Sequence, residues 1–231
     1  MGMDPSQCRG DCAGRRKTQP RGALTTDEVR SVIASAASLV EAGNVEPQAA
    51  IALRLAAVTG ARRSELAALR WTDLNAGRLT IDSSIAILRG GAERSTLTLR
   101  DDPTKTANRR VISLDASTVR ALEALRISLG AYGPWILSPG PDPVNPERVT
   151  AWWRRARDGA GLDSKWRLHD LRHWSATTSI AEGYDIRTVA NRLGHANPSM
   201  TLRTYAHAVE STDAPIAATL GFVIDEPDPT I

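Results

Sequence analysis

The histidines and one tyrosine of this chain gather near its C-terminal end. His169, His173, His195 and His207 all fall within residues 169–207, and Tyr205 lies in the same stretch. Histidine exchanges protons near neutral pH. A tyrosine phenol has a pKa of about 10 and becomes a nucleophile when a base or strongly cationic surroundings activate it. The combination is suited to acid–base and nucleophilic chemistry.

The first candidate motif is the sequence HDLRH at residues 169–173. If this segment is helical, His169 and Arg172 lie one turn apart on one face, so both side chains can reach the same ligand. The same spacing also occurs on surface helices whose charged side chains only contact water. Taken alone, the motif is therefore a weak indication of function.

A metal site is the main alternative for this segment. His169 and His173 are four residues apart, which is a spacing of zinc ligands on a helix. The residues between them are Asp170, Leu171 and Arg172. An arginine between two ligands would repel a cation, so we predict no metal and no cofactor.

A second candidate motif joins Leu193-Gly194-His195 to Tyr205. Gly194 ends a predicted helix and leaves His195 at its end, while Asn197-Pro198 begins the next helix. Tyr205 lies inside that next helix. A lone tyrosine on a helix is usually a half-buried core residue, so Tyr205 is informative only together with the other motifs.

The elements that must position these residues are mainly helical. Thr25 and Glu28 form a capping box at the start of the first helix, and apolar residues then recur at helical spacing up to Val40. A second helix runs from about Pro47 to Gly60, and a third carries Leu66 and Leu69. Further helices are predicted at 116–129, 145–159, 169–182, 185–193 and 199–208.

Three segments alternate between apolar and polar residues instead. They are residues 78–82, 96–100 and 110–114, and this period of two predicts strands of a small antiparallel sheet. The expected fold class is therefore α+β, mainly helical, with one sheet of about three strands. A chain of 231 residues is long enough to bury a substantial core.

The charge distribution is uneven. Residues 23–207 hold 24 Lys and Arg against 19 Asp and Glu, and 26 of the 29 basic residues in the whole chain are Arg. Arginine suits phosphate oxygens because its guanidinium donates two parallel hydrogen bonds. A GC-rich genome would also raise the arginine content, so composition leaves both explanations open.

The remaining features of the sequence exclude several classes of protein. Cys8 and Cys12 support neither a disulfide framework nor a zinc site. No apolar stretch approaches the length of a membrane span, and the start lacks the apolar middle of a signal peptide. We expect a soluble, cytoplasmic protein that does not act at a membrane, with residues 1–22 forming a tag or flexible linker.

Four motifs together resemble the tyrosine recombinase, or phage integrase, family. Residues 59–66 (TGARRSEL) resemble its first conserved box, residues 169–173 resemble the second, and Leu193-Gly194-His195 with Tyr205 completes the set. Residues 103–106 (PTKT), followed by 110–114 (RVISL), resemble the family's hairpin lysine segment. The resemblance covers about residues 24–210 and implies the fold of the family's catalytic domain.

The resemblance also implies a role for each matching residue. Arg62, Arg172 and His195 would stabilise charge on the non-bridging phosphate oxygens, and Tyr205 would attack the phosphorus. His169 would accept the phenol proton. Lys105, on the hairpin, would protonate the departing 5′ oxygen. The product would be a 3′-phosphotyrosine, formed without metal or ATP.

Other residues are expected to assist. By the same resemblance, Glu65 helps to hold the first-box arginine, and His173 belongs to the supporting surroundings. Arg63, Arg154 and Arg155 are candidates for contacts with the DNA backbone. A run of charges on a helix is also commonly only solvated, and that alternative stays open for Arg154 and Arg155.

The resemblance implies partners and a domain layout. The partners would be double-stranded DNA attachment sites, with a monomer when free and a homo-tetramer on synapsed DNA, in a bacterial or phage-infected cell. We expect a catalytic domain at 23–210, isolated from the family's usual upstream core-binding domain. The tail at 211–231 would dock on a neighbouring protomer or pack within its own chain. A type IB topoisomerase and a non-catalytic DNA-binding relative are the alternatives.

Overall fold

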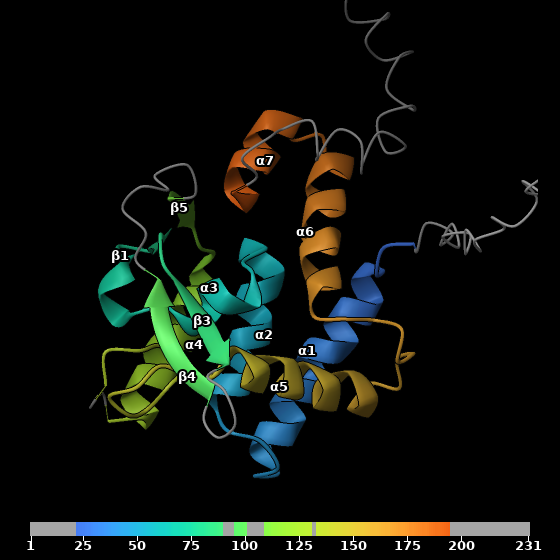
Figure 1. Cartoon of the computed structure of the whole chain (residues 1–231). Coiled ribbons are helices and arrows are strands. Elements are labelled where there is room, and N and C mark those ends of the chain that lie inside the picture. Colours follow the sequence, from blue (N-terminus) through green and yellow to red (C-terminus); the bar gives the residue numbers. More distant parts are fainter. Residues whose placement is uncertain (1–21, 90–94, 101–108, 131–132, 195–231) are drawn as a thin grey trace, which may run out of the picture.

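The computed structural model of the chain describes residues 22–89, 95–100, 109–130 and 133–194 (Figure 1). Its helices are α1 (Thr26–Glu41), α2 (Gln48–Thr59), α3 (Arg63–Ala67), α4 (Ala116–Ser128), α5 (Pro146–Gly159), α6 (His169–Ala181) and α7 (Ile186–Leu193), with a short 3-10 turn, η1, at Trp71–Asp73. Its strands are β1 (Leu74–Asn75), β2 (Arg78–Ile81), β3 (Ser84–Arg89), β4 (Ser95–Arg100) and β5 (Arg110–Ser113). The predicted helices are confirmed within these ranges, except that α3 ends at Ala67 and does not include Leu69. The helix predicted at 199–208 lies outside the described residues.

The helix ends follow local sequence signals. The Thr25 hydroxyl accepts a hydrogen bond from the Glu28 amide at 3.2 Å, and the Glu28 carboxylate accepts from the Thr25 amide at 2.7 Å. The predicted capping box is therefore confirmed. Helices α2 and α7 end at Gly60 and Gly194, whose φ angles are +63° and +68°, because a residue without Cβ enters the left-handed region at little cost.

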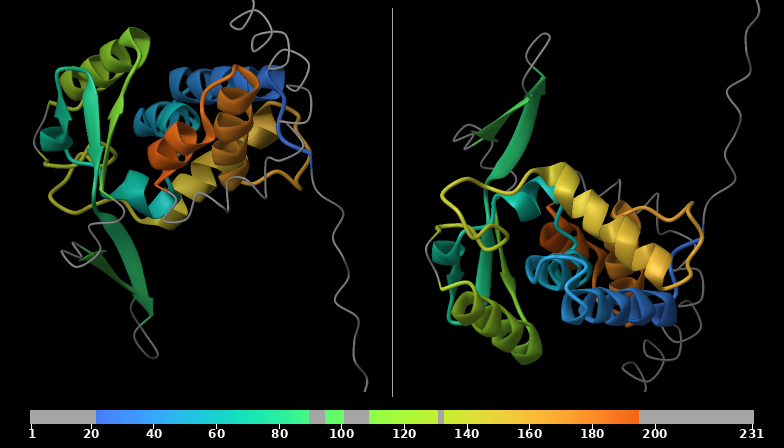
Figure 2. Two further views of the ribbon diagram at one scale, coloured as in Figure 1. Left: turned by 90° about the horizontal axis from the view of Figure 1, so that it is seen from above. Right: turned by 90° about the horizontal axis from the view of Figure 1, so that it is seen from below.

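Helix α2 is the centre of the fold. It contacts α1, α4, α5 and α6, and Figure 2 shows it enclosed by these neighbours. Leu53 and Leu55 are fully buried, and Trp153 from α5 is only 1% exposed. Trp152 is also buried, and Trp174 is partly buried against the same core, so these tryptophans belong to the core or to its edge.

The three-stranded antiparallel sheet is present, but its membership differs from the prediction. The strand order is β1-β2-β5, with Leu79 opposite Ile112 in the register of β2 and β5. The predicted strand at 96–100 pairs with β3 instead, with Ile85 opposite Leu99. Both edges of β2 are occupied, by β1 and β5, and β3 is the adjacent strand in the chain, so a β3–β4 hairpin forms.

The β3–β4 hairpin extends away from the helical body (Figure 2). Its base is anchored by Ile85, which is 2% exposed and packs against Ala67 and Ala68 at the end of α3. The hairpin is thereby attached to the same short helix that follows Arg62. In the part of the chain that the structure describes, no helix combines the length and the apolar character needed to cross a membrane.

Candidate active site

The turn between α2 and α3 brings the first-box residues to the surface of the core. The buried Thr59 hydroxyl donates to the Leu55 carbonyl at 2.6 Å and accepts from the Ala61 amide at 3.1 Å. A Cβ at Gly60 would lie 2.3 Å from Cδ2 of Leu193. Only glycine fits here, because the site combines positive φ with close packing against α7.

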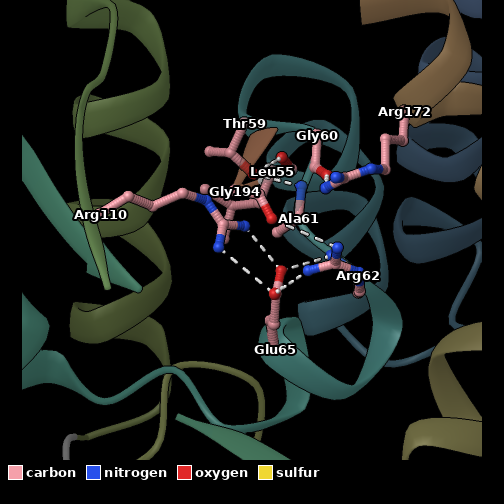
Figure 3. Close-up of polar contacts among 9 residues, drawn as sticks. All are labelled: Leu55, Thr59, Gly60, Ala61, Arg62, Glu65, Arg110, Arg172 and Gly194. Carbon is pink, nitrogen blue, oxygen red and sulfur yellow. Dashed lines mark hydrogen bonds and ion pairs between the residues drawn. The ribbon is translucent and has the colours of Figure 1, made fainter. Parts of the chain in front are cut away.

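Arg62 is held at the start of α3 by Glu65. Nη1 of Arg62 donates to Oε1 of Glu65 at 2.8 Å, and the Arg62 amide donates to Oε2 at 2.8 Å (Figure 3). Nη2 of Arg62 donates to the Gly194 carbonyl at 3.4 Å. The Arg62 side chain remains 40% exposed, so it is positioned by the protein and still accessible to a ligand.

Glu65 has a second arginine partner, Arg110 of β5. Nη2 of Arg110 donates to Oε2 of Glu65 at 2.6 Å and Nη1 donates to Oε1 at 3.3 Å. Burial acts to raise the pKa of Glu65, but the hydrogen bonds and charges of Arg110 and Arg62 outweigh it and lower the pKa. The carboxylate is therefore ionised at neutral pH.

Arg172 approaches the same turn from α6. It is 4% exposed, and its Nη1 donates to the Gly60 carbonyl at 2.6 Å. Figure 3 shows the Arg172 side chain reaching Gly60 of the α2–α3 turn, on which Arg62 lies two residues further along. The two arginines of the first and second motifs, 110 positions apart in the sequence, thus both lie at this turn.

His169 begins α6, one turn before Arg172. Its ring contacts the ring of His173 edge to face, with centroids 4.8 Å apart. Burial is the main cause of a lowered pKa for His169, the charges of His173, Arg172 and Arg62 add to this, and Asp170 opposes it. His169 is therefore neutral at pH 7 and able to accept a proton.

The end of α7 is clamped beside this cluster. Nη2 of Arg192 donates to the Val58 carbonyl at 2.8 Å and to the Ser113 carbonyl at 3.4 Å, which ties α7 to α2 and β5. Gly194 follows and contacts Arg62 as described above. Lys105, His195 and Tyr205, the three remaining predicted catalytic residues, lie outside the described residues.

The three predicted DNA-binding arginines have different surroundings. Arg63 donates to the Thr150 hydroxyl at 3.4 Å, and Arg63 and Arg154 line a groove of about 400 Å³ that His169 also lines. The exposed Arg155 instead donates to the Asn44 carbonyl at 2.6 Å. Arg155 contacts the α1–α2 turn and is not among the residues that line this groove.

Arg110 is the residue that sequence reasoning missed as part of the site. From the sequence it was placed in a predicted strand and in the segment that resembles the family's hairpin lysine segment, but it was given no role in the site. The alternation of the strand carries the signal that was missed. In β5 the residues alternate between buried and exposed, so Arg110 shares the inner face with Ile112. A charged residue at an inward position of a strand needs a buried partner, and Glu65 is that partner.

The zinc alternative finds no ligand cluster in the described ranges. No three His, Cys, Asp or Glu side chains there form a group that could hold a metal ion. His169 and His173 contact each other, but the nearest charges acting on His169 include the cations Arg172 and Arg62.

The chain belongs to the phage integrase family, whose model it matches over residues 23–211. It is 28% identical over 197 residues to tyrosine recombinase XerC 2 of Ralstonia nicotianae, covering 83% of this chain and 50% of that protein. It is also 28% identical over 225 residues to the prophage phiRv2 integrase of Mycobacterium tuberculosis, covering 94% and 56%. The chain thus spans about half the length of the curated relatives it matches, and the match corresponds to the catalytic domain of tyrosine recombinases.

Solved structures share the fold. The Tn1549 transposon integrase in complex with transposon right end DNA has a TM-score of 0.71 at 19% identity, covering 89% of this chain and 67% of that one. The XerA recombinase has a TM-score of 0.63 at 19% identity, covering 85% and 66%. A lambda integrase dimer bound to a core site has a TM-score of 0.56 at 23% identity, covering 80% and 61%.

Proposed function

We propose that this protein is a site-specific DNA recombinase that cuts and rejoins strands through a covalent bond to Tyr205. One observation carries the proposal. Arg62, Arg172 and a neutral His169 gather around the α2–α3 turn. Arg172 donates a hydrogen bond to the Gly60 carbonyl at 2.6 Å, and the charges of both arginines help to lower the pKa of His169. Two fixed cations beside a proton acceptor suit attack by a phenol on a phosphodiester.

The arginines have the right chemistry for the transition state. Negative charge builds up on the phosphate oxygens during phosphoryl transfer, and preorganised donors stabilise it at no further cost of reorganisation. Arg62 is partly exposed while its position is set by Glu65. Arg172 is held by its hydrogen bond to the Gly60 carbonyl of the turn. His195, which follows Gly194, would supply a third donor.

Proton transfers complete the reaction. His169 would accept the phenol proton as the Tyr205 oxygen forms a bond to phosphorus, and the bond from phosphorus to the 5′ oxygen would break. Lys105 would give a proton to that oxygen, which leaves as a hydroxyl. The strand then carries a 3′-phosphotyrosine, whose ester bond conserves the energy for rejoining by the reverse reaction.

The groove beside His169 is the proposed path for the DNA backbone. Its lining includes Arg63, Arg154 and Arg167 together with the Thr150 and Ser164 side chains. Arginines and hydroxyls of this kind bind phosphates without reading the sequence. Since His169 also lines the groove, a strand lying in it would pass beside the proposed proton acceptor.

The partners would be double-stranded attachment sites and further copies of the protein. Lambda integrase has been solved as a dimer on a core site and as a tetramer on a Holliday junction. We infer the same stages here, with a free monomer assembling into a tetramer when two sites synapse. The 211–231 tail, which lies outside the described residues, is proposed to dock on a neighbouring protomer.

Covalent capture of DNA tests the proposal. The chain and a Tyr205→Phe variant would be incubated in excess EDTA with a library of nicked duplexes of random sequence, and adducts would be separated on a denaturing gel. We expect an adduct from the wild type only, enriched in particular sequences. An adduct without sequence preference would favour a type IB topoisomerase, and no adduct would favour a non-catalytic DNA-binding protein.

A further inference from the structure

Arg110 is a buried cation with no role in the proposed chemistry. Its side chain is 6% exposed, and that of its partner Glu65 is 9% exposed. Taking both charges out of water costs free energy that their attraction only partly repays, so apolar residues of similar size often stabilise a fold equally well. Stability alone therefore does not explain the pair, and its location next to Arg62 suggests another purpose.

The geometry connects Arg110 to Arg62 through one carboxylate. Oε1 of Glu65 accepts from Nη1 of Arg62 at 2.8 Å and from Nη1 of Arg110 at 3.3 Å. Oε2 accepts from the Arg62 amide at 2.8 Å and from Nη2 of Arg110 at 2.6 Å. Each carboxylate oxygen accepts one hydrogen bond from Arg62 and one from Arg110, so rotation of the carboxylate would break hydrogen bonds to both arginines.

The charges give Arg110 a second effect. Arg62 and Glu65 alone would form a neutral pair, whose attraction for a phosphate is weak. Arg110 adds a second positive charge to the same carboxylate, so the three groups together carry one net positive charge. Arg62 is the exposed member of the three, and the excess charge is therefore available to a ligand at Arg62.

Arg110 also lies directly against Gly194. A Cβ at Gly194 would be 2.7 Å from Nη1 of Arg110 and 3.1 Å from its Cζ. The Gly194 carbonyl accepts from Arg62 on its other side. The backbone immediately before His195 is thus placed between two guanidinium groups.

We propose that Arg110 is a positioning residue of the active site, acting through Glu65 on Arg62 and through the Gly194 backbone on the start of the segment that carries His195. The proposal rests on the recombinase function above. Arg110 itself is buried and makes no contact with the substrate. A substitution that keeps its charge but not its paired hydrogen bonds should slow strand cleavage while leaving the binding of DNA in the ground state nearly unchanged.

Two substitutions separate positioning from simple support of the fold. Arg110→Lys keeps a positive charge near Glu65 but cannot donate two parallel hydrogen bonds, and Arg110→Met keeps the apolar stem without the charge. Arg109, the exposed neighbour on the same segment, provides matched controls as Arg109→Lys and Arg109→Met. Circular dichroism and thermal melting show whether each variant folds. If Arg110→Met does not fold, the test of positioning uses Arg110→Lys alone.

The first readout does not depend on activity. In protein with ¹⁵N-labelled arginine, the Nη–H signals of Arg62 are assigned by their loss in Arg62→Lys. We expect separate, slowly exchanging signals in the wild type and the Arg109 controls, because hydrogen bonds restrict rotation of the guanidinium. In Arg110→Lys these signals should broaden or merge.

The second readout is the rate of adduct formation on a nicked duplex, alongside the Kd for the same DNA. We expect the rate to fall about tenfold in Arg110→Lys and about a hundredfold in Arg110→Met, as for a misplaced catalytic group, with Kd changed by less than about twofold in Arg110→Lys, which keeps the charge. Unchanged Arg62 signals or an unchanged rate in Arg110→Lys would each overturn the proposal. If the wild type forms no adduct, the recombinase function fails and the Arg62 signals alone decide on positioning.

Discussion

Two arginine-rich regions of this molecule use the same side chain in different ways. On α5, Arg154, Arg155 and Arg157 lie within four consecutive positions but have different partners: Arg154 and Arg157 line the groove, Arg157 also bonds Asp158 and nearby carbonyls, and Arg155 bonds the Asn44 carbonyl. Around the α2–α3 turn, Arg62, Arg110 and Arg172 come from three distant segments and converge.

The difference lies in what the guanidinium groups bind. The α5 arginines emerge at different angles from one helix, and the hydrogen bonds of Arg155 and Arg157 go to separate acceptors. The arginines of the turn have buried acceptors: Arg62 and Arg110 share the Glu65 carboxylate, and Arg172 donates to the Gly60 carbonyl. A buried acceptor fixes the position of the cation that binds it, so the arginines of the turn are held near one another while those of α5 are not.

The largest expected effect is at the converging arginines. Arg172→Ala should reduce adduct formation by about a thousandfold, because it removes a fixed donor to the phosphate oxygens. Rates would be measured by quenched-flow sampling on a nicked duplex, with Arg187→Ala on the exposed face of α7 as the control. Equal rates for the two variants would mean that Arg172, and with it the grouping of arginines at the turn, does not contribute to strand cleavage.

His169 should set the acid side of the pH–rate profile. Its pKa is lowered below 6.5, so the neutral, proton-accepting form is present above that value and is lost as the pH falls through the lowered pKa. The rate should thus decline at a lower pH than the rate of an enzyme whose catalytic histidine has the ordinary pKa of 6.5. His169→Asn should lower the rate by about a hundredfold and remove this decline. Retention of the same acid limb in the variant would exclude His169 as the base.

Glu65 should stabilise the fold as well as the site. Glu65→Gln leaves Arg110 buried without a counter-charge, and we expect a loss of roughly 3 kcal/mol in the free energy of unfolding, measured by urea denaturation. Glu123→Gln on the exposed face of α4 is the control and should be neutral. A loss below about 0.5 kcal/mol, the usual range of surface substitutions, would show that Arg110 finds another partner.

The same carboxylate predicts a pH dependence of stability. The folded pKa of Glu65 lies below its ordinary value of 4.5, so its contribution is fully present above 4.5 and is lost as the pH falls through the lowered value. Between pH 5 and 3, chosen to bracket that ordinary value, the wild type should lose stability faster than Glu65→Gln. Parallel pH curves for the two proteins would contradict this assignment.

The smallest effect is expected on α5. Arg154→Gln should weaken DNA binding a few-fold and reduce the slope of log affinity against log salt by about one, as for the loss of one phosphate contact. Arg155→Gln should leave both unchanged, because Arg155 bonds Asn44. Fluorescence anisotropy at several salt concentrations measures the slope, and equal slopes for both variants would remove the distinction between the two arginines.

Much of this protein could be predicted without its structure. Thr25 and Glu28 mark the start of α1, Gly60 and Gly194 mark the ends of α2 and α7, and the apolar spacing marks the helices between, because caps and periodicity act within a few residues. The motif residues Arg62, His169 and Arg172 could also be predicted as site residues, because the short motifs around them resemble those of the tyrosine recombinase family.

The pairing of strands and the partners of buried charged side chains depended on the tertiary structure. Thr96–Arg100 shows strand periodicity, but only the packed chain decides that it joins β3 and that β1 completes the sheet. Arg110 resembles any charged strand residue until β5 turns it inward against Glu65, 45 positions away. A buried charge needs a counter-charge nearby. Which residue supplies it depends on how the whole chain packs, and local sequence does not reveal this.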